Sequence, residues 1–149
     1  MARGVFGNAI DYAAVRIRRR SWFPFQPRRV LMTPMGHIHV HPRSPSWRDD
    51  FSLGDWGDKG LFIHEMTHVW QAQRRGRWYL VLMRHPFSRY DYALRPGWPL
   101  ERYGLEQQAE IVRHAFLLRS GRLVRGAQGA EAYDLLVNFP GATLFNSAG

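Results

Sequence analysis

The apolar segment 61–70, LFIHEMTHVW, contains three side chains that together can do hydrolytic chemistry. His64 and His68 are four positions apart, and Glu65 follows the first of them. On an α-helix, residues four apart project from the same face, so both imidazoles can bind one metal ion. Glu65 can then deprotonate a water molecule on that metal, which is the chemical logic of the H-E-x-x-H pattern. The pattern therefore indicates metal-assisted hydrolysis.

The residues around this pattern strengthen the prediction. In a chain of this composition, H-E-x-x-H would occur by chance in roughly one shuffled sequence in a hundred. Its neighbours here are apolar and include no proline: Leu61, Phe62, Ile63, Met66, Val69 and Trp70. The alternative is a half-buried helix whose histidines are merely hydrogen-bonded. Burying such groups without a cation is costly, so the metal site is favoured.

A third metal ligand must come from elsewhere in the chain. Catalytic zinc usually has three protein ligands and one water, and this chain has no cysteine. The best candidates are Glu106 and Glu110, in the helical pattern LEQQAEIVRHAFLL. If the apolar residues of that pattern form the buried stripe, Glu106 borders it and Glu110 lies further round. We expect Glu106 to be the ligand and Glu110 to hold a ligand histidine, although Glu110 is the alternative ligand and either could be a solvated carboxylate.

Two other groups of residues are weaker candidates. Tyr90, Tyr92 and Tyr103 lie in a Pro- and Gly-rich stretch, 86–104, and could stabilise an oxyanion; packing within the loop is the alternative. In HIHVH, residues 37–41, alternate histidines share one face of a predicted strand. We interpret this face as polar, on an edge strand that could line a substrate cleft, rather than as a second metal site.

The length and composition indicate one globular domain, residues 1–149, with 45% hydrophobic residues. The net charge of +9 would attract nucleic acid or anionic lipid non-specifically. No sequence signature supports specific nucleic-acid binding. No apolar stretch is long enough for a signal peptide or a membrane span, so we expect synthesis in the cytoplasm without a signal peptide.

The pattern of elements predicts an α+β protein that is mainly helical, with a small N-terminal β-sheet. Helices are predicted at 8–14, 60–75, 78–83, 105–119 and 129–139, and strands at 15–20 and 36–42. Asp55 and Asp58 can cap the helix that carries HEMTH, and Gly76 can end it.

With these motifs in view, the chain resembles known families. HEMTH followed by Glu106 and Glu110 is similar to the gluzincin pattern of zinc metallopeptidases. The strings MTPMGHIHVHP, LFIHEMTHVWQ and LEQQAEIVRHAFLL resemble small zincin-like proteins related to the VgrG spike and Rhs proteins of type VI secretion. The resemblance implies Zn²⁺ bound by His64, His68 and Glu106, Glu65 as general base, and Glu110 orienting a histidine. Gluzincins commonly have Asp at the last position.

This resemblance implies a zinc metallopeptidase that acts as, or alongside, a bacterial type VI effector. Its partners would be a peptide or protein substrate, a secretion spike and an immunity protein, and it would be exported after synthesis. One alternative keeps the zinc in a non-catalytic structural or adaptor module. Another is a basic nucleic-acid-binding protein with an incidental motif.

Overall fold

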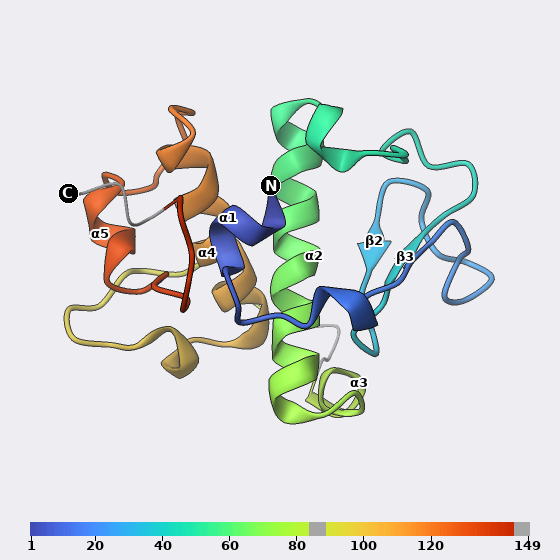
Figure 1. Cartoon of the computed structure of the whole chain (residues 1–149), viewed down its shortest axis with the longest axis horizontal. Coiled ribbons are helices and arrows are strands. Elements are labelled where there is room, and N and C mark those ends of the chain that lie inside the picture. The colour runs from blue at the N-terminus through green and yellow to red at the C-terminus, as the bar shows by residue number, and fades with distance from the viewer. Residues whose placement is uncertain (84–88, 145–149) are drawn as a thin grey trace.

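The computed structural model describes residues 1–83 and 89–144 of the chain. Helix α2 (Trp56–Arg75), which carries HEMTH, runs through the middle of the molecule (Figure 1). It begins four residues before the predicted start because the Asp55 side chain accepts the Asp58 backbone N–H at 2.8 Å. It ends at Gly76, whose φ of 95° favours glycine, as predicted.

Helix α4 (Leu105–Arg119) has the bounds that the sequence predicts. It lies beside α2, on the side away from the sheet (Figure 1). The two helices approach closely at Gly60, where a Cβ atom would lie 3.1 Å from Nε of Arg113. Ile63 and Val69 of α2 and Ile111 and Val112 of α4 are fully buried in the same core cluster.

The sheet lies on the other side of α2 (Figure 1). Its three described strands are β1 (Ile17–Arg18), β2 (Leu31–Met32) and β3 (Ile38–Val40), in the order β1-β3-β2. β1 pairs with β3 in parallel, and β2 pairs with β3 antiparallel. The HIHVH segment is therefore the central strand of this described sheet, and the prediction of an edge strand is wrong. The two strands that flank it are each only two residues long.

Several short elements differ from the sequence predictions. The N-terminal helix is α1 (Ala2–Phe6), and residues Tyr12–Ala14 form only a 3-10 turn. The last helix, α5 (Glu131–Asp134), has four residues instead of eleven. After it the chain turns so that Phe139 packs on Phe6, with ring centroids 5.0 Å apart. Burial in the core therefore overrides the helical pattern of residues 135–139.

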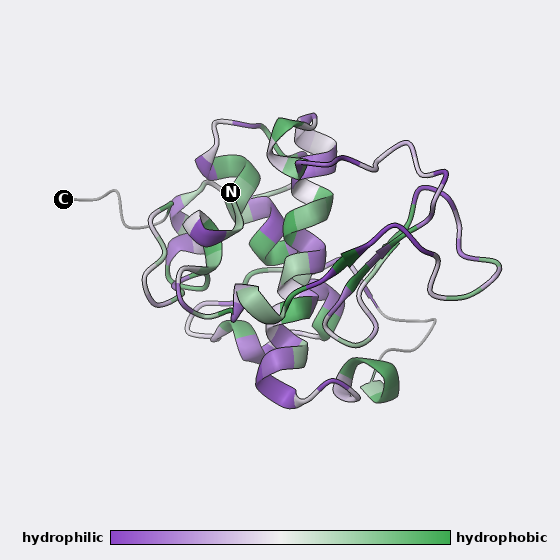
Figure 2. Cartoon of the chain, turned by 45° about the vertical axis from the view of Figure 1, so that its right-hand side comes forward, coloured by the Kyte–Doolittle hydropathy of each residue, from purple (hydrophilic) through white to green (hydrophobic). Residues whose placement is uncertain are grey.

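The remaining described elements are α3 (Tyr79–Met83) and 3-10 turns at Phe51–Leu53 and Leu100–Arg102. α3 is hydrophobic along its length, whereas α2 alternates between hydrophobic and hydrophilic residues (Figure 2). Residues 89–99 contain no helix or strand, in line with the predicted loop, whose residues 86–88 lie outside the described part.

The predicted architecture, mainly helical with a small sheet, is confirmed. Across the described residues, no helix has the length and apolar composition needed to cross a membrane.

Candidate metal centre

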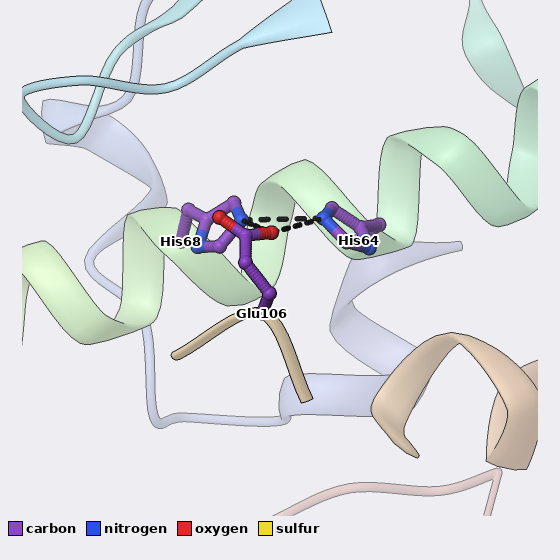
Figure 3. Close-up of side chains that lie close together, drawn as sticks. All are labelled: His64, His68 and Glu106. Atoms are coloured by element: carbon purple, nitrogen blue, oxygen red, sulfur yellow. Dashed lines mark hydrogen bonds and ion pairs between the residues drawn. The ribbon is translucent and has the colours of Figure 1, made fainter. Parts of the chain in front are cut away.

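Two predicted ligands from α2 and one from α4 meet at a single point (Figure 3). Nε2 of His64 lies 3.2 Å from Nε2 of His68, and Oε2 of Glu106 lies 3.2 Å from each of them. All three residues are buried, with exposed fractions of 5%, 0% and 1%. Among the described residues, this is the cluster of histidine and acidic side chains that could hold a metal ion.

The outer nitrogen of each histidine is held by an oxygen acceptor. Nδ1 of His64 lies 2.8 Å from Oε1 of Glu110, and Nδ1 of His68 lies 2.8 Å from Oε1 of Gln71. The amide nitrogen of Gln71 donates to the carbonyl oxygen of Leu105, so its oxygen is left to accept. Both Nδ1 atoms therefore donate, and both Nε2 lone pairs point to the centre. Metal-binding histidines are held in this way.

The donor set fits a divalent metal. Two imidazole lone pairs and one carboxylate oxygen that face each other at 3.2 Å repel unless a cation or a proton lies between them. Tetrahedral bonds of about 2.0–2.1 Å to zinc separate the ligand atoms by about 3.3 Å. The observed triangle therefore matches one face of such a tetrahedron. Nitrogen and carboxylate ligands suit zinc, and other first-row metals also accept them.

The charges around His64 shift the proton equilibria of the centre. Burial lowers the pKa of His64, but hydrogen bonds to Glu106 and Glu110 outweigh it and raise the pKa to about 9. Burial raises the pKa of Glu110, yet its bonds to His114 and His64 and the charge of Arg113 hold it well below the usual range. Glu110 is therefore ionised, and His64 holds a proton at neutral pH when no metal replaces it.

Glu65 is also buried, with an exposed fraction of 2%. Its Oε2 accepts a hydrogen bond of 2.6 Å from the hydroxyl of Thr33, which follows β2 directly and is fully buried. This bond holds the carboxylate in place, and the negative charge of Glu65 helps to raise the pKa of the neighbouring His64. Thr33 was not among the predicted site residues, although it lies in the string MTPMGHIHVHP, because no spacing there links a threonine to Glu65. Gln71 was not predicted either, although a polar residue one turn after His68 was a usable signal.

The three loop tyrosines, which were predicted as oxyanion candidates, make three different contacts. The hydroxyl of Tyr103 accepts the Arg95 N–H at 2.8 Å, and that of Tyr92 bonds to Nδ1 of His114 at 2.6 Å. The ring of Tyr90 stacks on His64, with centroids 6.2 Å apart and planes 20° apart. Tyr90 is thus the loop tyrosine whose ring lies against a candidate ligand.

The HIHVH histidines are not part of the metal-capable cluster that the described residues form. His39 is buried, and its ring packs edge-to-face against the ring of Trp22, with centroids 5.2 Å apart. Burial lowers the pKa of both His37 and His39, and nearby Arg18 lowers it further. A basic environment of this kind disfavours a second cation site.

A cavity of about 460 Å³ opens beside the candidate centre. Glu106 lines it, together with Trp70, Arg74, Tyr79 and Leu105. The lining of the cavity is therefore partly apolar and includes a candidate metal ligand, Glu106.

The fold and the centre together define an α+β protein with a buried His-His-Glu cluster and an adjacent buried glutamate. No family model matches the chain. In an alignment of 147 positions that covers 94% of this chain, it is 38% identical to the type VI secretion system spike protein VgrG2b of Pseudomonas aeruginosa. The chain spans only 14% of the length of that relative.

A solved structure shows the same relationship. The effector domain of Pseudomonas aeruginosa VgrG2b matches 89% of this chain at a TM-score of 0.68 and 36% identity, and 74% of that domain is covered. The chain belongs to the family of the VgrG2b effector domain. The predicted resemblance to VgrG-related proteins of type VI secretion is thereby confirmed.

Proposed function

We propose that this protein is a zinc-dependent metallopeptidase that acts as a type VI secretion effector. The observation that carries the proposal is the triangle of His64, His68 and Glu106, with 3.2 Å between the ligand atoms and buried Glu65 beside it. Two neutral imidazoles and a carboxylate leave a fourth position for water in a catalytic zinc site. A buried carboxylate next to that position is the group that peptide hydrolysis requires.

The roles of the side chains follow from this arrangement. Bound zinc would lower the pKa of a water molecule and polarise the scissile carbonyl group. Glu65 would accept a proton from the attacking water and deliver it to the leaving amine. Glu110 and Gln71 keep the two imidazoles in the tautomer that can bind a metal. The cavity beside Glu106 can receive a side chain of the peptide substrate.

The family supports the biological setting of the proposal. VgrG2b is a type VI secretion system spike protein, and the matched structure is its effector domain. By homology, this protein would be delivered by a secretion spike to act on a peptide or protein. A cell that makes such an effector would need an immunity partner to restrain it.

The second candidate function keeps the metal but has no turnover, so the protein would be a structural or adaptor module of the secretion apparatus. The convergence of ligands supports both candidates equally. Glu65 separates them, since it is outside the ligand triangle and a purely structural site has no use for a buried carboxylate there.

The test combines metal analysis with a matched variant. We expect elemental mass spectrometry to find about one zinc per chain in the wild type and in Glu65→Gln, and none in a His64→Ala, His68→Ala double variant. Glu65→Gln should lower peptidase activity by about 10²–10⁴-fold. Full activity in Glu65→Gln would contradict the proposed role of Glu65. Zinc without activity in the wild type would favour the structural module, and absence of zinc would contradict both.

A further inference from the structure

The positive charge of this protein is concentrated in one segment. Residues 12–48 contain eight arginines and no acidic residue, so they carry eight of the nine net positive charges. This segment forms the whole described sheet and its connections, on one side of α2 (Figure 1). The rest of the chain therefore carries a net charge of only +1.

The connection between β1 and β2, residues 19–30, also exposes large aromatic side chains. It extends outward beyond the sheet (Figure 1). Trp22, Phe23 and Phe25 in this connection are 43%, 39% and 88% exposed. Exposed arginines stand on both sides of them, at 18–20 and at 28–29. A cluster of exposed aromatic residues within a basic patch marks an interaction site.

A buried glutamine holds this connection in shape. Gln26 is only 3% exposed. Its Oε1 accepts the Trp22 N–H at 2.7 Å, and its Nε2 donates to the carbonyl oxygens of Val30 and His39 at 2.8 and 3.2 Å. The amide thus ties both arms of the connection to β3. The aromatic side chains are therefore presented by a braced loop, so little ordering entropy is lost when they bind.

We infer that this loop, residues 19–30 with Arg18, is a docking surface for an anionic lipid membrane. Arginines attract the lipid phosphates, and aromatic side chains insert at the level of the headgroups. Phe23 and Phe25 have no polar atom that would need a partner within the headgroup layer, and the side-chain amide of Gln26 is satisfied within the fold. A phospholipid surface therefore fits the loop, and the tests below distinguish it from a single-stranded nucleic acid, whose bases would stack on the same rings. The inference is independent of the proposed peptidase activity.

Vesicle binding tests the inference on the chain of residues 1–149. We expect the wild type to sediment with vesicles of equal parts phosphatidylcholine and phosphatidylglycerol, and not with phosphatidylcholine alone. An Arg28→Gln, Arg29→Gln variant should bind the anionic vesicles about 25-fold more weakly, at about fivefold per arginine. The control, Arg77→Gln with Arg125→Gln, has the same net charge but lies outside the segment, so it should bind almost as the wild type does. Equal losses in both variants would overturn the inference, because binding would then follow net charge alone.

Insertion of the aromatic residues is tested separately. The chain has no cysteine, so Phe25→Cys and Leu123→Cys each accept one environment-sensitive fluorophore. Both positions are exposed, at 88% and 102%, and both variants should fold. We expect anionic vesicles to shift the emission to the blue and to shield the fluorophore from an aqueous quencher only at position 25. No shift there, or tighter binding to a single-stranded oligonucleotide than to vesicles, would overturn the inference.

Discussion

Each histidine of the candidate centre is held through its outer nitrogen, but the two partners differ in charge. His64 faces the carboxylate of Glu110, whereas His68 faces the neutral amide of Gln71. A carboxylate stabilises an imidazolium and also makes a neutral imidazole a stronger ligand. A proton and the metal therefore compete most directly for Nε2 of His64.

This competition predicts a pH dependence of zinc binding. The pKa of His64 is raised to about 9, so metal-free protein holds a proton there at about pH 8, where an ordinary histidine would be neutral. Zinc binding at about pH 8 should release about one proton, and the apparent affinity should rise with pH up to about 9. Calorimetric titration in two buffers of different ionisation enthalpy measures the release. Identical heats in both buffers would contradict the prediction.

Thr33 affects the centre through Glu65. The hydrogen bond of 2.6 Å between them joins two buried side chains from segments 32 residues apart. Thr33→Val keeps the shape but removes the hydroxyl, so we expect kcat to fall by about tenfold with zinc content and KM little changed. Thr33→Ser should restore most of the loss. If the valine and serine variants are equally impaired, the hydroxyl is not what matters.

At the scale of elements, α4 and the middle of α2 could be predicted because their apolar periodicity and their ends agree. The start of α2 was harder, since Gly57 and Gly60 suggest a loop and only the Asp55 cap reveals the first turn. The central position of β3 and the shortness of α5 depend on contacts between distant segments. The two histidines and Glu106 could be predicted because each lies in a helix with a clear apolar pattern. Thr33 could not, because its contact with Glu65 joins segments 32 residues apart.

The cap of α2 gives a prediction at this scale. Asp55→Ala removes the acceptor of the Asp58 N–H and should lower the free energy of unfolding by about 1 kcal/mol. Asp55→Asn retains an acceptor and should cost much less. Urea unfolding of the two variants measures the difference. Because Asp55 lies more than two turns before His64, zinc content should stay unchanged, and a loss of zinc in the alanine variant would show that the cap also positions the ligands.

For the whole molecule, the candidate metal would cross-link two helices that lie far apart in the chain and, without cysteine, cannot be joined by a disulfide. His64 and His68 belong to α2 and Glu106 to α4, 38 residues or more along the chain. A ligand that binds only the folded state stabilises it by mass action, by about 4 kcal/mol at a thousand times its Kd. For a chain of 149 residues we therefore expect zinc removal to lower Tm by about 8–16 °C.

The variants decide whether this effect arises at the proposed centre. Thermal unfolding with and without a chelator should show the shift in the wild type and in Glu65→Gln, since Glu65 lies outside the ligand triangle. The His64→Ala, His68→Ala variant should show no shift. If that variant keeps the zinc-dependent shift, the metal binds elsewhere, and HIHVH becomes the next segment to test. If Glu65→Gln also loses the shift, Glu65 holds the metal itself and its assignment as a base is wrong.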